Sequence, residues 1–465
     1  MSGLDAFRHE YLRVLRRFHA GEMTREDWAR WDASRLTAVL RHVTARSPFY
    51  RRHLAGVDID RITPDRLPEL PFTTKEDLRR ARYEVLSGGL AEALVFYETT
   101  GTTGPPTPCP RGPKDVLTSN AAIEEAWRRL FRDRFGDRMP VVGLMGPSEL
   151  YAFGDVFTAV TAALGACHVK IWPESPRVGF RKALRLIAEL GVEVVVCAPA
   201  MVLSLAKAAR HHGYDPARLP ISVFLVLGEI CTPQFAANAA GVWPGARVYP
   251  TLYGSQEALC IATGAVTGRL HLSRLNYLVE LIDPDTGRHL GDTGTGELVL
   301  TMLIDGIKPL IRYRTGDLVR VTPAPPDAPL PGLVVEVLGR VDDRVTVGTA
   351  TLCPAELEAL VLEGVRGCLG YQIVIDAPDG IDEVTVRLDP PPGGLPEPVT
   401  RQVAARLRER TGARVRVVID PDLDPVTRTG SYVSWKAARI VDDRTAADPA
   451  AQVARQVAHR YAITT

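Results

Sequence analysis

Short apolar runs alternate with helix-length amphipathic stretches between residues 138 and 255 of this chain. The apolar runs are Pro140–Met145, Cys167–Trp172, Val192–Ala198, Val223–Leu227 and Ala246–Tyr249. Stretches with apolar residues at helical spacing separate them, near 155–165, 178–190, 200–212 and 232–240. This alternation predicts an α/β layer with a largely parallel sheet. Because ligands bind at the carboxyl ends of such strands, residues that follow each run are candidate binding residues.

The regions on either side of this layer have different patterns. Residues 1–60 predict a helical lead-in, and residues 270–340 predict a β-rich subdomain. Beyond Arg340 the pattern predicts a smaller α/β unit, with helices near 354–363 and 398–412 and strands near 370–376, 382–388 and 414–419. We therefore predict a large domain over residues 1–340 and a small C-terminal domain over residues 341–465.

Composition narrows the function classes. The 465 residues carry a net charge of +1, so nothing points to a nucleic-acid partner. The seven cysteines include no C-x-x-C pair, which disfavours a zinc site and predicts reduced, buried thiols. The sequence shows neither a signal peptide nor an apolar run of membrane-spanning length. We expect a soluble cytoplasmic protein without a membrane partner.

One loop is rich in hydroxyl groups and glycine. Between Glu98 and Pro105 stand Thr99, Thr100, Gly101, Thr102, Thr103 and Gly104. Glycine lets the backbone turn its N–H groups inward, and threonine adds hydroxyl donors, so the loop suits the oxygens of a polyphosphate. Clusters of this composition are also ordinary turns, and the loop alone does not decide between the two interpretations.

Further motifs follow in a fixed order. They are Tyr253–Glu257, Tyr313–Leu318, Gly339–Asp343 and a C-terminal Lys436. Their order and spacing resemble the adenylate-forming enzymes, which include acyl- and aryl-CoA ligases, adenylation domains and luciferases. The phenylacetate–CoA ligase branch is especially similar. The chain shares with it the segments Leu70–Leu78, Gly228–Glu229 and Pro309–Thr315 as well as the threonine-rich loop.

This resemblance implies that a carboxylate attacks the α-phosphorus of ATP to give an acyl adenylate and pyrophosphate. Catalysis of such a step consists mostly of positioning and charge stabilisation. The implied catalytic residues are Lys436, which bridges the carboxylate and the α-phosphate, Glu257, which binds Mg²⁺, and Arg340, which supports the ribose or phosphate. Asp342 matches the hinge about which the C-terminal domain rotates.

The resemblance also implies a set of nucleotide-binding residues. The threonine loop from Thr99 to Gly104 would hold the β- and γ-phosphates. Asp317 would accept hydrogen bonds from the ribose hydroxyls. Tyr253 would cover the adenine face, and Gly228 and Glu229 would line its edge through the backbone. The remaining members of this set are Gly254 and Gln256. Each of these residues also has an ordinary structural interpretation, such as a turn-stabilising aspartate or a solvated surface lysine.

Four positions depart from the usual family pattern. Pro105 stands where the phosphate loop normally has a lysine, and Gln256 replaces a threonine or serine. Gly348–Thr349 replaces an Arg-Gly pair whose glycine faces the pantetheine arm in relatives, and Thr349 is stiff at χ1. Trp435 replaces the glycine before the C-terminal lysine. These departures indicate a specialised relative.

The sequence thus predicts an ATP-dependent ligase that adenylates a small, aromatic acid. CoA, an acyl carrier protein and a small amine remain open as the acceptor. One alternative is a relative that activates an unusual acid such as nitrite toward an aromatic amine. Another is a nucleotide-binding relative without catalysis. Relatives in this branch suggest a homodimer, and the departures suggest a role in secondary metabolism.

Overall fold

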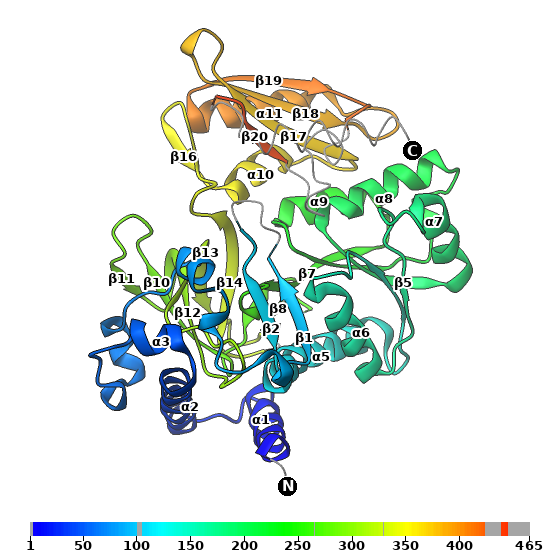
Figure 1. The fold of residues 1–465 in the computed structure, drawn as a ribbon. Helices are drawn as coiled ribbons and strands as arrows, with labels where there is room; N and C mark the ends of the chain where they lie inside the picture. The colour runs from blue at the N-terminus through cyan, green and yellow to red at the C-terminus, as the bar shows by residue number, and fades with distance from the viewer. Residues whose placement is uncertain (1–2, 100–104, 265, 329, 424–438, 445–465) are drawn as a thin grey trace. The chain divides into compact units, whose positions relative to one another are not determined.

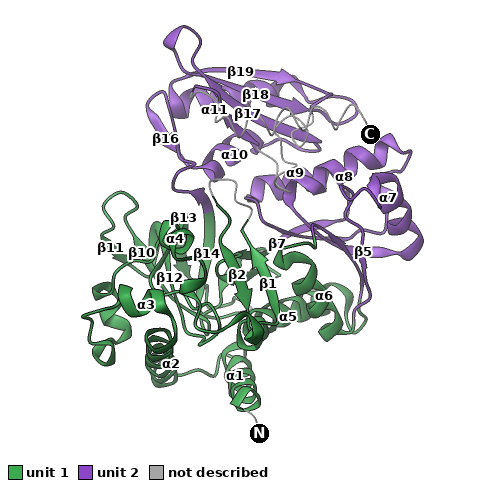
Figure 2. Cartoon of the chain, viewed as in Figure 1, with its two compact units in different colours: residues 1–139, 148–165, 251–337 green, residues 140–147, 166–250, 338–465 purple. Residues whose placement is uncertain are grey.

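The computed structural model describes residues 3–99, 105–264, 266–328, 330–423 and 439–444 (Figure 1). The chain divides into two compact units, which Figure 2 colours separately. Unit 1 comprises residues 1–139, 148–165 and 251–337, and unit 2 comprises residues 140–147, 166–250 and 338–465. Each unit is therefore assembled from three separate segments of the sequence.

The predicted parallel strands form part of unit 2. They are β3 (Val141–Met145), β4 (His168–Lys170), β5 (Val192–Cys197) and β6 (Val223–Leu227). The strands are parallel, in the order β6-β5-β3-β4. Every residue of β6 is buried, which explains its unbroken apolar run, since parallel strands are covered on both faces. The predicted alternation is confirmed.

Helices connect these parallel strands. In unit 2 they are α7 (Gly179–Leu190), α8 (Pro199–His211) and α9 (Pro233–Val242). Helix α7 ends at Gly191, whose φ of 64° is the left-handed conformation that glycine adopts at low cost. Helix α9 begins after Thr232, whose hydroxyl accepts the backbone N–H of Phe235. These start and stop residues are local reasons for the strand–helix alternation.

A second, smaller sheet in unit 2 is built from the C-terminal part of the chain. Its strands are β17 (Gly370–Asp376), β18 (Glu383–Asp389), β19 (Arg414–Ile419) and β20 (Ile440–Asp442), in the order β19-β18-β17-β20. Helices α10 (Pro354–Leu362) and α11 (Glu397–Thr411) and the hairpin of β15 (Val345–Val347) and β16 (Ala350–Leu352) belong to the same region. The helices and three of the strands were predicted, whereas β20 was not.

Unit 1 is richer in antiparallel strands. In the order β11-β10-β12-β13-β14-β9-β8-β7 they are β11 (His289–Gly291), β10 (Tyr277–Ile282), β12 (Gly294–Met302), β13 (Tyr313–Pro323), β14 (Leu333–Arg340), β9 (Leu270–Leu272), β8 (Leu259–Gly264) and β7 (Arg247–Ser255). The first residues of β7 and the last of β14 belong to unit 2. The expectation of a mixed α/β fold with a β-rich part is confirmed.

Helices cover the strands of unit 1. They are α1 (Gly3–His19), α2 (Arg25–Arg46), α3 (Pro48–His53), α4 (Lys75–Ala81), α5 (Pro113–Phe135) and α6 (Ala152–Leu164). The first three confirm the helical lead-in. The lead-in is fixed by polar contacts as well as by apolar burial: Tyr11 donates to Asn276 at 2.8 Å, and the indole of Trp31 donates to the carbonyl of Leu275 at 3.1 Å.

The burial of the cysteines agrees only in part with the prediction. Five cysteines are buried free thiols, but Cys167 is exposed and Cys231 is half-buried, so burial was predicted too broadly. Within the described ranges, no helix combines the length and the apolar character that a membrane crossing requires. The division into domains at Arg340, with its hinge at Asp342, stays a prediction.

Candidate functional site

The threonine-rich loop lies in the sequence between two paired strands of unit 1. Strands β1 (Val95–Glu98) and β2 (Pro108–Arg111) are antiparallel, and the loop joins them. The N–H of Thr99 donates to the carbonyl of Thr107 at 3.2 Å, and the N–H of Thr107 donates to the hydroxyl oxygen of Thr99 at 2.9 Å. Thr99 therefore closes the base of the loop. The predicted phosphate-binding residues Thr100, Gly101, Thr102, Thr103 and Gly104 lie outside the described residues.

A buried arginine ties this hairpin to the predicted metal-binding segment. Arg111 is fully buried, and its Nη2 donates to the carbonyl oxygens of Gln256 and Glu257, each at 2.5 Å. Within the described part of the chain, its Nε and Nη1 have no hydrogen-bond partner. The guanidinium therefore fixes the backbone of the segment and adds a cation where a polyphosphate is expected.

The end of β7 and the turn that follows it contain four of the predicted residues, Tyr253, Gly254, Gln256 and Glu257. The pairing of β7 with β8 shifts register between Tyr253 and Gly254. A Cβ on Gly254 would lie 2.1 Å from the carbonyl oxygen of Leu259, so only glycine fits there. The amide oxygen of Gln256 accepts the N–H of Ala152 at 3.4 Å. The bulkier side chain at this position thus contacts the start of α6.

Lys75 lies beside Glu257, and the sequence analysis assigned it no role. Its Nζ is 3.8 Å from Oε1 of Glu257, and the two side chains are 30% and 7% exposed. The segment that contains Lys75 is docked on β13: Thr73 donates its N–H to the carbonyl of Arg312 and accepts the N–H of Arg314. A capping box between Thr74 and Asp77 then starts α4 at Lys75. The Leu70–Leu78 motif therefore places an ammonium group at the predicted metal carboxylate.

Tyr253 and Asp317 are brought together on neighbouring parts of unit 1. The hydroxyl of Tyr253 donates to Oδ2 of Asp317 at 2.7 Å. Asp317 follows Gly316, which has a φ of 73°, and its N–H donates to the hydroxyl of Thr315 at 3.1 Å. Asp317 is half-buried, so its carboxylate is oriented but keeps accepting capacity for other donors. The predicted ribose and adenine residues thus form one pair.

Gly228 and Glu229 follow β6 in unit 2. Gly228 has a φ of 86°, which turns the chain sharply after the strand. The carboxylate of Glu229 accepts the N–H of Ala200 at 3.0 Å, in the first turn of α8, where the helix dipole favours negative charge. The same carboxylate lies 3.6 Å from Nη2 of Arg439. Its oxygens thus interact with the protein, in keeping with the expected recognition of adenine through the backbone of this loop.

Arg439 is the centre of a buried ionic cluster in unit 2. Its Nη1 lies 2.7 Å from Oε2 of Glu358 and donates to the hydroxyl of Tyr371, while its Nη2 donates to the carbonyl of Ile230 at 2.6 Å. Glu358 also accepts the hydrogen bond of the Tyr371 hydroxyl. Burial raises the pKa of Tyr371 well above its usual value. Burial opposes the charge of Arg439, but Glu358 and its neighbours more than compensate and raise the arginine pKa.

The predicted hinge follows β14. Arg340 is exposed at the end of that strand, and its carbonyl accepts the N–H of Asp343 at 3.2 Å. Burial raises the pKa of Asp343, against the opposing effect of Arg340. Thr349, one of the four departures, donates its N–H to the carbonyl of Thr411 at 2.9 Å. This turn is therefore attached to the end of α11. Lys436 and Trp435 lie outside the described residues.

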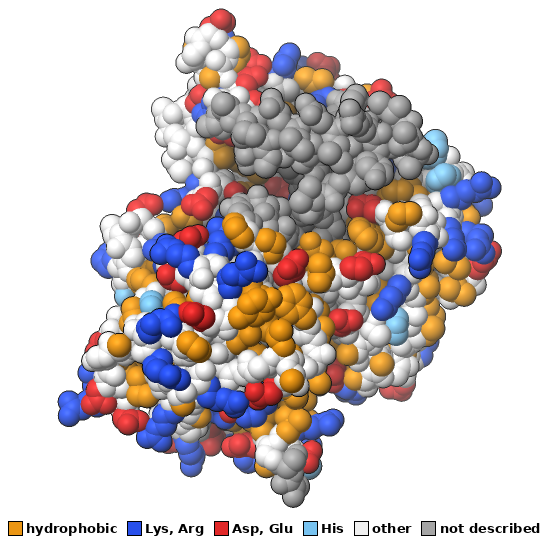
Figure 3. Space-filling model, viewed as in Figure 1, with side chains coloured by type: hydrophobic (Ala, Val, Ile, Leu, Met, Phe, Trp, Pro, Cys, Tyr) orange, Lys and Arg blue, Asp and Glu red, His pale blue; other side chains and the backbone are white. Residues whose placement is uncertain are grey.

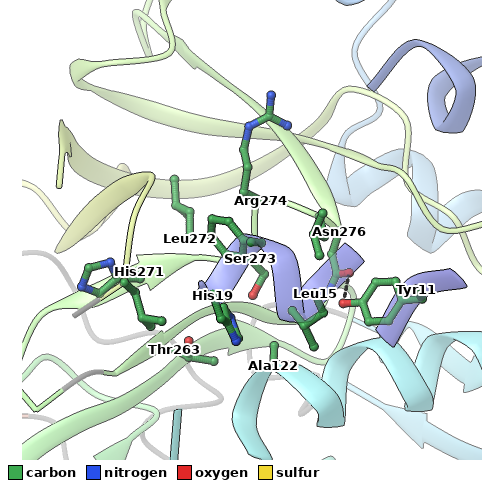
Figure 4. A pocket seen from close by; sticks show the side chains of 13 residues that line it. Tyr11, Leu15, His19, Ala122, Thr263, His271, Leu272, Ser273, Arg274 and Asn276 are labelled. Carbon is green, nitrogen blue, oxygen red and sulfur yellow. Dashed lines mark hydrogen bonds between the residues drawn. The ribbon is translucent and has the colours of Figure 1, made fainter. Parts of the chain in front are cut away.

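Unit 1 also contains a cavity of about 20 Å³, which Figure 4 shows. Side chains of α1, α5 and β9 line it, among them His19, Ala122 and His271, but none of the predicted site residues does. Burial lowers the pKa of both histidines to about 4, so both are neutral at pH 7. The cavity has room for roughly one water molecule.

The surface in Figure 3 carries Lys and Arg side chains interspersed with Asp and Glu. Two exposed examples are the pairs of Arg52 with Glu84 and of Arg66 with Glu69. Isolated pairs of this kind contribute little to stability. Apolar side chains gather in the middle of the same face, where Figure 1 draws β1 and β2, and Leu90, Leu94 and Leu150 are exposed large apolar residues of unit 1.

This chain is similar to one family model, two ligases and one solved structure described below. The family model described as AMP-binding enzyme matches residues 30–302. A phenylacetate-coenzyme A ligase from Thermus thermophilus is 28% identical over 397 residues, which cover 82% of this chain and 84% of that protein. Another from Aromatoleum evansii is 27% identical over 378 residues, covering 76% and 80%. Crystalline 2-hydroxyisobutyryl-CoA ligase in its postadenylation state shares the fold, with a TM-score of 0.75, 20% identity and coverage of 96% and 93%.

Proposed function

We propose that this chain, which belongs to the family of AMP-binding enzymes, adenylates a small aromatic carboxylic acid and transfers the acyl group to the thiol of coenzyme A. The chain is an ATP-dependent adenylate-forming ligase, similar to the phenylacetate–CoA ligases. The aromatic acid and the acceptor are the proposed part. The relatives named as phenylacetate-coenzyme A ligases support both.

The observation that supports the adenylation step is the arrangement of polar groups in unit 1. Glu257 and Lys75 lie 3.8 Å apart, and Tyr253 orients Asp317 by a hydrogen bond of 2.7 Å. The backbone of Glu257 is held by Arg111, which also belongs to the hairpin of the threonine-rich loop. Two carboxylates and an ammonium group thus lie on one unit, and this arrangement supports the proposed roles of Glu257, Lys75 and Asp317 in the recognition of a nucleoside triphosphate.

Glu257 is the residue that we propose for Mg²⁺. The ion prefers oxygen ligands and is usually held by one or two carboxylates together with substrate phosphates. The carboxylate of Glu257 is such a donor, and its side chain is 7% exposed. Bound there, the ion would neutralise charge on the phosphate oxygens. Lys75 is placed to neutralise the same charge, because a flexible ammonium can turn from Glu257 to a phosphate oxygen.

The remaining roles follow the family pattern and are proposals. The backbone of Gly228 and Glu229 would contact the edge of adenine, and Arg340 would support the ribose or phosphate. Lys436 would bridge the attacking carboxylate and the α-phosphate, at a position within a C-terminal domain of residues 341–465 that turns at Asp342. The acid oxygen attacks the α-phosphorus, the bond to the β-phosphate oxygen breaks, and pyrophosphate leaves.

Product analysis tests this function. ATP, MgCl₂ and a panel of aryl acids are incubated with the protein, and pyrophosphate release is followed. Coenzyme A, a phosphopantetheinylated carrier protein and simple amines are then supplied separately, and the product masses are measured. We expect pyrophosphate release with an aryl acid and a CoA thioester. Absence of pyrophosphate with every acid, from a folded protein that binds ATP, would contradict the adenylation step.

A substitution of the proposed catalytic lysine tests its role in the adenylation step. Lys436→Ala is expected to abolish pyrophosphate release while ATP affinity stays close to that of the unsubstituted protein, because the lysine acts on the α-phosphate as the bond forms. Unchanged turnover would remove Lys436 from the site. A product with an amine or a carrier thiol, and none with CoA, would leave the adenylation step standing and correct the acceptor.

A further inference from the structure

A short loop in unit 2 is held at two points by residues from the C-terminal part of the chain. This loop, residues 228–232, contains the proposed adenine-binding pair and ends at the first residue before α9. The carbonyl of Ile230 accepts Nη2 of Arg439 at 2.6 Å. At the other end, the N–H and hydroxyl of Thr232 donate to Oε1 of Glu358 at 3.1 and 2.8 Å.

The two ends of the Arg439 guanidinium have different partners. Nη2 faces the loop, since it donates to Ile230 and lies 3.6 Å from Glu229. Nη1 faces the C-terminal sheet and α10, because it donates to Tyr371 and lies 2.7 Å from Glu358. The group also lies 5.3 Å from the ring centre of Phe235 and 5.4 Å from that of Tyr371. One planar cation therefore joins the loop to the C-terminal sheet with a fixed geometry.

Burying these charged side chains costs free energy, because it removes them from water. The side chains of Arg439, Glu229 and Glu358 are 9%, 5% and 4% exposed, so their charges are largely removed from water. A well-packed apolar cluster of similar volume often stabilises a fold as much as or more than a buried ion pair. What the ionic cluster adds is direction, because each hydrogen bond fixes the orientation of a particular carbonyl, hydroxyl or carboxylate.

Arg439 is itself anchored at the edge of the C-terminal sheet. The N–H of Ile373 in β17 donates to the carbonyl of Arg439 at 2.8 Å, and the next residue, Ile440, starts β20 beside β17. The orientation of the Ile230 peptide therefore depends on whether β20 is in place. Glu229 is fixed from the other side by the first turn of α8, so a loss of Arg439 releases the loop on one side only.

We propose that Arg439 is a positioning residue that couples adenine binding at the Gly228–Glu229 loop to the docking of strand β20. It holds the Ile230 carbonyl and the Glu229 carboxylate, and thereby sets the backbone that faces adenine. This inference rests on the proposed role of the loop in nucleotide binding. Coupling between two sites is reciprocal, so the nucleotide that prefers the ordered loop also favours the docked strand.

Binding measurements on the full chain test this coupling. In Arg439→Gln we expect calorimetric ATP affinity to fall about tenfold, the size of one lost hydrogen bond to a charged group. Inorganic tripolyphosphate has no adenine, so its affinity, measured by competition with ATP, should stay unchanged. Glu229→Gln keeps an oxygen that can accept the Ala200 N–H but removes the charge beside Arg439. Its ATP affinity should also fall, by a smaller factor than in Arg439→Gln.

Amide hydrogen exchange gives a readout that a merely structural role does not move. ATP should slow exchange in Ile440–Asp442 of the unsubstituted protein and should not do so in Arg439→Gln. Lys207→Met is the matched control. Lys207 joins α8 to the C-terminal sheet through Asp389 at 2.7 Å but does not contact the loop, so ATP affinity and ATP-dependent protection should be retained.

The outcomes separate this inference from the proposed function. If Arg439→Gln does not fold, Glu229→Gln carries the same comparison. ATP affinity and ATP-dependent protection equal to those of the unsubstituted protein in both variants would overturn the coupling, whatever the pyrophosphate assay shows. Equal losses in Lys207→Met would overturn it too, because docking in general would then be responsible. ATP binding with the predicted pattern but no pyrophosphate from any acid would overturn only the proposed function.

Discussion

Carboxylates that follow strands have different surroundings in the two units. In unit 1, Glu257 lies 3.8 Å from the ammonium of Lys75, a side chain that is 30% exposed. In unit 2, Glu229 accepts the N–H of Ala200 and lies beside Arg439, a side chain that is 9% exposed. The residue type and its place after a strand are alike, and the exposure of the neighbouring cation differs. We therefore expect Glu257 to bind a ligand and Glu229 to hold the protein backbone in place.

The difference follows from the chemistry of the two cations. Lysine carries a compact charge on a flexible stem and can turn from one anion to another. Arginine forms several hydrogen bonds with a planar group, and Arg439 uses both of its terminal nitrogens within unit 2. Substitutions in the unit 2 cluster should therefore reduce stability, whereas substitutions in unit 1 should reduce activity in a protein that stays folded.

The largest effect is expected for Glu358→Ala. The Glu358 side chain is 4% exposed, and its carboxylate accepts hydrogen bonds from Thr232 and Tyr371 in addition to its ion pair with Arg439. Its removal leaves a buried guanidinium with one carboxylate at 3.6 Å, so we expect a loss of about 3–5 kcal/mol in the stability of this region. Hydrogen exchange of α9, α10 and β17 as a function of urea measures it.

The control for Glu358 is Glu363, the residue that follows the same helix, α10. Glu363→Ala removes an exposed carboxylate, 62% accessible, that lies 3.7 Å from Arg406. Such a surface change is expected to stay within about 0.5 kcal/mol. If Glu358→Ala cost no more than Glu363→Ala, the buried cluster would not stabilise unit 2, and the contrast between the two units would be lost.

Glu257→Gln should have the next largest effect, and on activity alone. The amide has the same shape, and Arg111 binds the backbone carbonyl at this position, which the substitution leaves in place. Loss of the charge that holds Mg²⁺ should lower pyrophosphate formation about 100-fold, as removal of one electrostatic group at a reacting centre commonly does. Raising the MgCl₂ concentration should recover part of the rate.

Thermal melting tells activity from folding in this case. Glu76→Gln, which removes an exposed carboxylate of α4 that pairs with Arg80, should leave the rate unchanged. A Glu257→Gln protein with full activity at every MgCl₂ concentration would exclude this carboxylate as the metal ligand. A large fall in melting temperature would instead show that Glu257, like Glu229, acts on the backbone.

Lys75→Met should have a smaller effect, confined to the triphosphate. Methionine keeps the apolar stem and removes the ammonium group. We expect the KM for ATP to rise about tenfold, which corresponds to roughly 1.4 kcal/mol for one lost charge contact. The affinity for pyrophosphate should fall by a similar factor. The transfer step that starts from a synthetic acyl adenylate lacks these phosphates and should keep its rate. Lys182 is an exposed lysine of α7, and Lys182→Met serves as the control. An unchanged KM in Lys75→Met would show that Lys75 only balances the charge of Glu257.

Sequence reasoning predicted the parts of this molecule that depend on local pattern. The alternation of apolar runs and amphipathic stretches predicted β3, β5, β6 and their helices nearly to the residue, because the runs are buried strands, a glycine follows α6 and α7, and Thr232 caps α9. The family resemblance assigned Tyr253 and Asp317 to the same nucleotide, and the hydrogen bond between them was not predicted. Family order, and not local pattern, carried that assignment.

The residues that were missed act through contacts between distant parts of the chain. Lys75 belongs to a motif that was noticed, but only the docking of Thr73 on β13 brings its ammonium to Glu257. Arg111 and Arg439 stand among many arginines, and no spacing distinguishes them from exposed ones before the fold is known. The short strand β20 has no run of its own and forms because β17 offers a free edge to Ile440–Asp442.

Tyr253→Phe gives the smallest expected effect and the sharpest reading of unit 1. The substitution removes only the hydroxyl that donates to Asp317 at 2.7 Å and keeps the ring proposed to cover adenine. Half-buried Asp317 can take a water in its place, so we expect a loss of about 1 kcal/mol, or about fivefold in KM for ATP. If the hydroxyl orients Asp317 toward the ribose, the variant should discriminate less between ATP and 2′-deoxy-ATP. Equal discrimination in both proteins would mean that the hydrogen bond between Tyr253 and Asp317 stabilises the fold and does not orient Asp317 toward the ribose. In that case the carboxylate of Asp317 in unit 1, like that of Glu229 in unit 2, would bind protein groups and not a ligand.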